Sequence, residues 1–259
     1  MDRAIDDPGE ALNPPPPMET LPGADSVASA RQALVSDGAH VMAAAATKSC
    51  LGAESGAWER FAAHWETLSP DTYASERGTR RLRRYGQFSF VPATGEVNLL
   101  PQAPFVQPES SNPLYVSVDR VFEPLTSSFA ADPVLHAVLR LLGRLASALD
   151  EPTVWNAKVH PFRVVASGDA YGLPTPEGRH RDGVTLVSSL LVGRRNAAGG
   201  ESSVYDLDGR KLLATTLSEP GTLLVGDDRR TLHSVSPVRP VDDERPAYRD
   251  ALVVTFTPS

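Results

Sequence analysis

The spacing of apolar residues changes near Pro152, and this change limits the folds that the 259-residue chain can adopt. Before Pro152, apolar residues recur every three or four positions, which is the spacing of an amphipathic helix. After it they alternate at every second position in short runs separated by Gly, Pro, Asp and Asn, which is typical of β-strands. The sequence therefore predicts helices first and then an unbroken series of strands, a pattern of α+β proteins.

Three segments before Pro152 favour helices. Apolar side chains recur at roughly helical spacing from residue 27 to 45 around Gly38, and residues 57–68 (AWERFAAHWETL) place aromatic side chains on one helical stripe. The most regular helix follows Asp132 and Pro133, an N-cap with proline at the first helical position. We therefore predict a helical front over residues 27–150.

Seven short strands are predicted after Pro152, and we expect them to form the core over residues 152–259. They are VWNAKVHPFRVVA, GVTLVSSLLV, SSVYDL, KLLATTL, GTLLVG, TLHSVSPV and RDALVVTF. This order favours a sandwich or small barrel with helices packed outside one sheet. Nothing marks a second domain, so residues 27–259 are predicted to form a single domain. Residues 1–26 carry the run Pro14–Pro17 and several acids, and we expect a disordered tail there.

Charge and cysteine content disfavour several kinds of partner. The 32 acidic and 25 basic residues give a formal charge of -7, which argues against nucleic acid and against an anionic membrane surface. No apolar run approaches the ~20 residues that span a bilayer. The acidic opening MDRAIDDPGE lacks the apolar core of a signal peptide, and Cys50 is the only cysteine. We expect a cytoplasmic protein that acts on a small molecule as a monomer or a homodimer.

His180 and Asp182 stand two residues apart at the start of a predicted strand. In extended backbone, residues i and i+2 point to the same face, so an imidazole nitrogen and a carboxylate oxygen can converge on one point. His233 lies about 50 residues further on and can supply a third ligand from a strand that folds back. Two histidines and one carboxylate on one face of a metal leave the opposite positions open, as in non-haem Fe(II) oxygenases.

These residues also have structural interpretations. His180 and Asp182 can form a surface ion pair at a turn, with His233 an ordinary strand histidine. Arg249 starts the last predicted strand, where its guanidinium can bind a carboxylate in the same cavity or pair with Asp250. The position of Arg249 on that strand favours the metal interpretation.

Four segments, PEGRHRDG, GGESSVYD, GDDRRTLHSVSPV and YRDALVVTF, together carry a resemblance to a known family. They resemble the Fe(II)/2-oxoglutarate dioxygenases that include the bacterial L-isoleucine 4-hydroxylases and related free amino acid hydroxylases. Weaker similarity in RRLRRYGQF, FVQPESSNPLYVSVDRVFEPL and VWNAKVHPFRV extends it over most of the chain after the tail. The resemblance implies a double-stranded β-helix, or jelly roll, which agrees with the strand pattern.

By matching motifs, the resemblance implies that His180, Asp182 and His233 bind Fe(II) and that Arg249 binds the distal carboxylate of 2-oxoglutarate. If Arg249 does not, Arg245 is the next candidate. The implied reaction is hydroxylation of a C–H bond of a free L-amino acid, aliphatic or cyclic, with O2. It is coupled to decarboxylation of 2-oxoglutarate to succinate and CO2, and is expected in specialised metabolism such as antibiotic biosynthesis. Two alternatives stay open: a peptide-bound or carrier-tethered substrate residue, and a non-catalytic jelly-roll binding module.

The arginine-rich segment that contains RRLRRYGQF allows three interpretations. Its arginines are Arg77, Arg80, Arg81, Arg83 and Arg84. They can bind phosphate or nucleic acid, but the overall charge favours a solvated face. The resemblance favours a third interpretation, in which Arg84 reaches inward to the carboxylate of the amino acid substrate.

Five further residues are candidates for binding the substrate. His160 and Arg163 lie on opposite faces of one predicted strand, so only one of them faces the cavity, and we expect it to be Arg163. Gln107 and Asn112 match polar positions of the family, or else cap a loop. Glu177 is expected to receive the substrate amine, or else belongs to a Pro-Glu-Gly turn.

Overall fold

The computed structural model of the protein describes residues 23–75, 78–105 and 120–259. Most of the expected disordered tail falls outside these ranges. Its predicted boundary at residue 26 is wrong, because the first helix already begins at Ala24. That helix buries Val27, Ala30 and Leu34, so packing holds its first turn in place.

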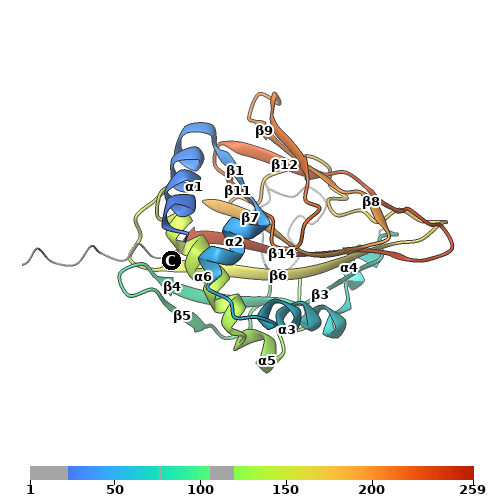
Figure 1. Ribbon diagram of the computed structural model, residues 1–259, viewed down its shortest axis with the longest axis horizontal. Coiled ribbons are helices and arrows are strands. Elements are labelled where there is room, and N and C mark those ends of the chain that lie inside the picture. The colour runs from blue at the N-terminus through green and yellow to red at the C-terminus, as the bar shows by residue number, and fades with distance from the viewer. Residues whose placement is uncertain (1–22, 76–77, 106–119) are drawn as a thin grey trace, which may run out of the picture.

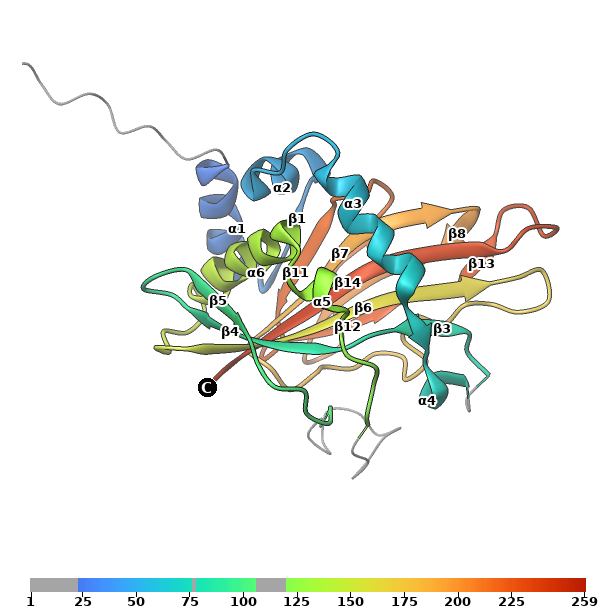
Figure 2. The ribbon, with the colours of Figure 1, turned by 90° about the horizontal axis from the view of Figure 1, so that it is seen from below.

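Most of the helices lie together on one side of the molecule, whereas the short helix α4 lies apart from them beside β3 (Figures 1 and 2). In chain order they are α1 (Ala24–Asp37), α2 (Ala44–Leu51), α3 (Ala57–Ala63), the 3-10 helix η1 (His64–Thr67), α4 (Thr72–Ser75), α5 (Ser127–Ala130) and α6 (Pro133–Ala146). The predicted start of α6 is confirmed, since the Asp132 carboxylate accepts a 2.8 Å hydrogen bond from the Val134 amide and Pro133 occupies the first turn. In the described part of the chain no helix is long and apolar enough to span a bilayer.

A nine-stranded sheet forms the centre of the fold. Its main path runs β1-β11-β7-β14-β6-β3-β2, while β4 pairs with β6 and with β5. The strands are β1 (Ala39–Met42), β2 (Ser69–Pro70), β3 (Arg81–Arg83), β4 (Gly86–Val91), β5 (Glu96–Leu99), β6 (Trp155–Ala166), β7 (Leu186–Arg195), β11 (Leu223–Asp227) and β14 (Ala247–Pro258). All of these pairs are antiparallel, and segments from both ends of the chain meet in one sheet.

Two smaller sheets complete the strands of the described residues. The order β10-β9-β12 joins β10 (Lys211–Thr216), β9 (Glu201–Asp206) and β12 (Thr231–Val235), and β13 (Val238–Pro240) pairs with β8 (Ala197–Gly199). All seven predicted strands are present, whereas the three-residue strands β8 and β13 were not predicted.

The predicted helical front is wrong where β1 to β5 occur, at residues 39–42, 69–70, 81–83, 86–91 and 96–99. Strands β1 and β4 are short, and their pairing partners β11 and β6 lie far away in the sequence. Local periodicity carries no signal of such long-range pairing. The broader α+β assignment is confirmed, because helices and mostly antiparallel strands make up the fold.

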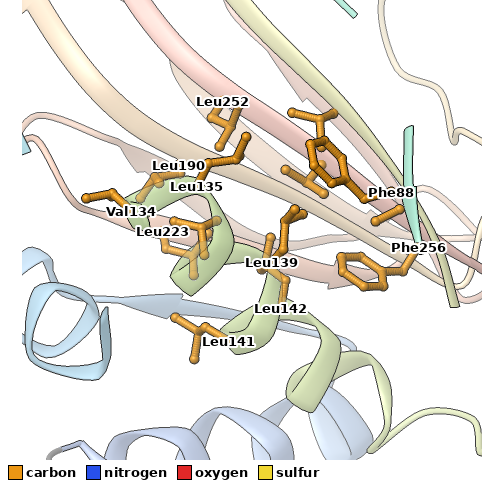
Figure 3. Close-up of a cluster of buried hydrophobic side chains, with 14 of the residues drawn as sticks. Phe88, Val134, Leu135, Leu139, Leu141, Leu142, Leu190, Leu223, Leu252 and Phe256 are labelled. Atoms are coloured by element: carbon orange, nitrogen blue, oxygen red, sulfur yellow. The ribbon is translucent and has the colours of Figure 1, made fainter. Parts of the chain in front are cut away.

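The central sheet separates the hydrophobic core from a cavity. On β14, the side chains of Leu252, Val254 and Phe256 join the core beneath the helices, as Figure 3 shows for Leu252 and Phe256. The alternate residues Val253 and Thr255 line the cavity on the other face. Because side chains alternate along a strand, β14 serves both sides of the sheet at once.

Candidate metal centre and substrate cavity

A cavity of about 510 Å³ lies between the central sheet and the β10-β9-β12 sheet. Strands β6, β7, β11 and β14 contribute to one wall, and β9, β12 and the segment before β7 contribute to the other. His180, Asp182, His233 and Arg249 all line this cavity. The fold thus brings together four residues that were selected from the sequence.

His180 and His233 are directly opposite each other. The His180 amide donates to the His233 carbonyl at 3.0 Å, and the His233 amide donates to the His180 carbonyl at 2.8 Å. This reciprocal pair fixes the segment before β7 against β12 and leaves the two imidazole centroids 4.3 Å apart. Backbone pairing therefore places both histidines, in line with the expectation that His233 comes from a strand that folds back.

Asp182 completes a compact group of donor atoms. Its Oδ1 lies 3.9 Å from His180 Nε2 and its Oδ2 lies 3.7 Å from His233 Nε2. One ligand atom from each of the three residues falls within 4.8 Å of the others. His180 Nδ1 is 3.0 Å from the Gly178 carbonyl, so Nδ1 donates a proton to this oxygen and Nε2 is the ring nitrogen left to face the group. Two imidazoles and one carboxylate in this arrangement fit a non-haem Fe(II) ion.

The protonation state of His233 also suits a metal ligand. Burial, and then neighbouring His180, lower the pKa of His233 to about 3, against the opposing effect of Asp228. The ring is therefore neutral near pH 7, which is the form that binds a metal. Glu177 borders this group, with Oε1 3.2 Å from His180 Nε2, and its side chain lines the cavity.

Arg249 presents a buried guanidinium to the same cavity. The residue is 3% exposed, and its Nε and Nη2 have no hydrogen-bond partner among the described residues. Burial, and then the charge of Arg194, lower the pKa of Arg249 to about 10, so it stays a cation at neutral pH. A buried guanidinium with unused donors fits an anionic ligand such as the carboxylate of a diacid.

Two alternatives from the sequence are wrong, namely an ion pair of Arg249 with Asp250 and a place for Arg245 in the cavity. Asp250 binds Arg163 instead, accepting hydrogen bonds of 2.8 Å with both of its carboxylate oxygens. Arg245 does not line the cavity, because its exposed side chain pairs with Asp242 at 2.7 Å.

The arginine-rich segment turns two guanidinium groups inward, but neither belongs to Arg84. Arg84 donates to the Thr67 and Pro124 carbonyls, both at 2.8 Å, and does not line the cavity. Arg81 and Arg83 alternate on β3 and do line it, so the expected solvated face is wrong for both. Pairing of β3 with β6 sets which arginines face inward. Arg77 lies outside the described residues.

Arg83 and Arg81 differ in how they are paired. Arg81 binds Asp71 through Nε at 2.9 Å and Nη2 at 2.8 Å. Arg83 lies 3.7 Å from the same carboxylate oxygen, and its buried Nε has no hydrogen-bond partner in the described ranges. Its guanidinium carbon sits 3.5 Å from the Phe122 ring centroid, so aromatic packing fixes its orientation.

On β6, His160 faces the cavity and Arg163 does not, which reverses our expectation while confirming that they lie on opposite faces. Arg163 pairs with Glu66 of η1 and with Asp250 on the helical side. Arg83 Nη2 donates to His160 Nδ1 at 2.7 Å, so the imidazole is neutral with its proton on Nε2. Burial, and then the charge of Arg83, hold the pKa of His160 well below its usual value.

Other cavity residues were missed or cannot be placed. Arg120 and Lys158 line the cavity but were not selected, although both lie in the segments of weaker similarity to the family. Lys158 had a usable signal, since it stands two residues before His160 on the same strand face. Gln107 and Asn112 lie outside the described residues.

Comparison with known proteins agrees with this geometry. The model of a family described as 2OG-Fe dioxygenase matches residues 62–255. A bsmA homolog from Methylobium petroleophilum PM1 is 34% identical in sequence, and its crystal structure superimposes with a TM-score of 0.83, covering 90% of this chain and 93% of that one. No curated protein sequence matches the chain significantly.

Two further solved structures share the fold at lower identity. IDO from Bacillus thuringiensis is 19% identical, with a TM-score of 0.73 and coverage of 90% of this chain and 96% of that chain. The Fe(II)/(alpha)ketoglutarate-dependent dioxygenase TqaL is 18% identical, with a TM-score of 0.72 and coverage of 91% and 88%. These likenesses confirm the predicted α+β fold with a jelly-roll core.

Proposed function

Because the chain belongs to the 2OG-Fe dioxygenase family, we propose that it hydroxylates a C–H bond of a free L-amino acid, aliphatic or cyclic, using Fe(II), O2 and 2-oxoglutarate. One observation carries the proposal: the donor atoms of His180, Asp182 and His233 share a cavity with buried guanidinium groups, among them those of Arg249 and Arg83. The guanidinium of Arg249 suits the cosubstrate, and that of Arg83 suits the carboxylate of a second acid.

In the proposed site, Fe(II) is held by His180 Nε2, His233 Nε2 and the Asp182 carboxylate. When bound together with 2-oxoglutarate and O2, the iron supplies an oxidation that converts C–H to C–OH while 2-oxoglutarate becomes succinate and CO2. The retained carboxylate of Asp182 supports hydroxylation over halogenation, because related halogenases lack it.

Arg249 binds the distal carboxylate of 2-oxoglutarate in this proposal. Its cavity-facing donors carry a positive charge in a site that excludes most water, so a charge-assisted hydrogen bond there is strong. A fixed anchor at one end of the diacid sets the position of its other end.

The substrate is oriented by opposite charges and an apolar wall. Arg83 binds the amino acid carboxylate, and the Nε2–H of neighbouring His160 is available as a further donor. Glu177 receives the ammonium group. Apolar side chains such as Val164, Val187 and Val253 surround the aliphatic part and keep water from the reacting carbon.

The first test is a panel of common and cyclic L-amino acids incubated with Fe(II), 2-oxoglutarate and O2. We expect mass spectrometry to show the gain of one oxygen atom on at least one free amino acid, with one succinate formed per product. The Asp182→Ala variant should form no product, since it lacks a metal ligand. If succinate formed only with peptide-bound or carrier-tethered residues, the free amino acid assignment would be wrong.

The second test separates Arg83 from its neighbour Arg84. Arg83→Gln should raise the KM for the amino acid by about 10- to 100-fold, the loss expected for a charge-assisted hydrogen bond. Arg84→Gln is the matched control, because Arg84 binds backbone carbonyls and lies outside the cavity wall. An equal KM change in both variants would contradict the role of Arg83.

We further propose that the reaction belongs to the biosynthesis of specialised metabolites such as antibiotics and takes place in the cytoplasm. Support for this context comes from the resemblance to amino acid hydroxylases and from the sequence composition. Detection of the hydroxylated amino acid in the producing cell, and its loss on gene deletion, would test it.

A further inference from the structure

Asp228 is a buried carboxylate beside the proposed metal centre. It is 1% exposed and directly follows β11, in the turn that leads to β12 and His233. Its Oδ1 accepts a hydrogen bond from the Asp182 amide at 3.1 Å, and its Oδ2 accepts from the Gly183 and Val184 amides at 2.7 and 3.0 Å. One side chain thus satisfies three consecutive backbone donors of the segment that carries Asp182.

The same carboxylate also faces the other ligand-bearing segment. Its Oδ1 lies 3.7 Å from His233 Nδ1, a buried atom with no hydrogen-bond partner among the described residues. When His233 Nε2 binds a metal, the proton of the neutral ring resides on Nδ1, which is the side that faces Asp228. Two carboxylates therefore flank this imidazole, with Asp182 on the Nε2 side and Asp228 on the Nδ1 side.

The preceding residue provides a contrast. Asp227 is also buried, at 2% exposed, but its carboxylate pairs with Arg229 and Arg230, at 3.0 Å in each case. Its carboxylate also accepts a 3.2 Å hydrogen bond from the Arg229 amide, so these contacts stay within the turn between β11 and β12. The two adjacent acids therefore have separable roles. Asp227 stabilises the turn in which it lies, whereas Asp228 contacts the segments that carry Asp182 and His233.

We propose that Asp228 is a positioning residue for iron: it holds the Asp182 backbone and the His233 ring in the arrangement that binds the metal. This inference rests on the proposed metal site formed by His180, Asp182 and His233. Gly183 has a φ of 75°, so the segment after Asp182 follows a backbone path that few residue types adopt. Without the Asp228 carboxylate, the backbone amides of residues 182–184 lose their hydrogen-bond acceptor. The backbone that carries the Asp182 side chain is then no longer held in place.

The test is metal affinity and not catalytic rate. Full-length wild type, Asp228→Asn and Asp227→Asn are titrated anaerobically with Co(II), and binding is followed by the visible ligand-field spectrum. We expect Asp228→Asn to bind Co(II) about 10- to 100-fold more weakly and with an altered spectrum. A loss of this size is typical when a residue that hydrogen-bonds to a metal ligand is replaced. Asp227→Asn should keep the wild-type affinity and spectrum even if its thermal stability falls, because its partners are Arg229 and Arg230.

Several outcomes would overturn the inference. Unchanged Co(II) affinity and spectrum in Asp228→Asn would exclude a positioning role while leaving the metal site intact. Equal losses in Asp227→Asn and Asp228→Asn would assign the effect to general destabilisation. Absence of Co(II) and Fe(II) binding by wild type would overturn the metal site and this inference together. By contrast, weakened Co(II) binding in Asp228→Asn alone would support the inference even if the amino acid panel failed, since that failure concerns the proposed substrate.

A second measurement covers the case in which Asp228→Asn does not fold. Hydrogen exchange of the metal-free wild-type protein should show strong protection of the Gly183 and Val184 amides, because Asp228 already holds them without metal. Fast exchange of both amides in the metal-free protein, with protection gained only on adding Co(II), would contradict preorganisation by Asp228.

Discussion

The buried arginines that line the cavity differ in whether their hydrogen-bond donors already have partners. Arg249 keeps two donor atoms without a partner in the described part of the chain, whereas Arg81 on the neighbouring wall is satisfied by Asp71. An unsatisfied buried donor costs free energy, so the fold retains such a group only where something else contacts it. Loss of the Arg249 side chain should therefore weaken ligand binding more than it lowers the free energy of unfolding.

Replacing Arg249 by alanine should weaken 2-oxoglutarate binding selectively. We expect the KM for 2-oxoglutarate to rise by about 10- to 100-fold, corresponding to the loss of a hydrogen bond to a charged group. Steady-state kinetics and Co(II) titration of the same variant should show that metal affinity is retained. Arg245→Ala is the control, since its exposed side chain pairs with Asp242, and it should keep the wild-type KM. A larger effect of Arg245→Ala would reverse the assignment.

Strand β6 contributes to both the hydrophobic core and the cavity, whereas helix α6 contributes to the core. Strand β6 directs Trp155, Ala157 and Val159 to the core and presents Lys158 and His160 to the cavity. Helix α6 then covers the core face with its leucine-rich stripe (Figure 3). Because one strand has both tasks, a change in core packing displaces cavity side chains through the shared backbone.

The core face of α6 should dominate stability. Leu139 is fully buried against the sheet, and Leu139→Ala should lower the free energy of unfolding by about 2–5 kcal/mol. Urea denaturation measures this loss. Arg144→Ala, on the exposed side of the same helix, should stay within about 0.5 kcal/mol of wild type. Similar losses in both variants would contradict the packing described here.

The turn between β8 and β9 packs closely against the Arg249 side chain at Gly200. A Cβ atom at Gly200 would lie 3.2 Å from Arg249 Cδ and 3.3 Å from Arg194 Nη1, at a φ of 70°. We expect Gly200→Ala to displace the Arg249 side chain and raise the KM for 2-oxoglutarate by about 3- to 10-fold in steady-state assays.

Gly95→Ala is the matched control for Gly200→Ala. Gly95 has the same φ of 70°, but a Cβ atom at this position would meet no described atom within 4 Å, so the substitution introduces backbone strain without a new contact. If the two variants raised the KM equally, strain and not displacement of Arg249 would explain the effect.

The position of the cavity couples ligand binding to the stability of the whole molecule. The cavity is walled by the central sheet on one side and by β9 and β12 on the other, so a bound metal and cosubstrate contact both. Ligands that bind only the folded state stabilise it by about 2.7 kcal/mol at a concentration of 100 times Kd.

Thermal denaturation should therefore show additive effects of the two ligands. Under anaerobic conditions, we expect Fe(II) plus 2-oxoglutarate at such concentrations to raise the Tm by about 10–20 °C, roughly half of it from each ligand. In Arg249→Ala, the increase due to Fe(II) should persist and the increase due to 2-oxoglutarate should fall to about half or less. An unchanged response to 2-oxoglutarate in this variant would place the cosubstrate elsewhere.

The sequence predicts the metal-ligand set better than the substrate wall, for a physical reason. His180 and Asp182 are close in the chain, and backbone alternation alone puts them on one face. The choice of Arg83 over Arg84 depends on how the three-residue strand β3 pairs with β6, which no local pattern encodes. Likewise, alternation separated His160 from Arg163, but only the packing of η1, through Glu66, shows which face is the helical side.

The most direct test of the proposed metal centre is anomalous diffraction at the iron edge from crystals grown anaerobically with Fe(II) and 2-oxoglutarate. We expect one iron peak bounded by His180, Asp182 and His233, with the distal carboxylate of 2-oxoglutarate against Arg249. An iron peak away from these three side chains, or none at all, would contradict the proposed centre.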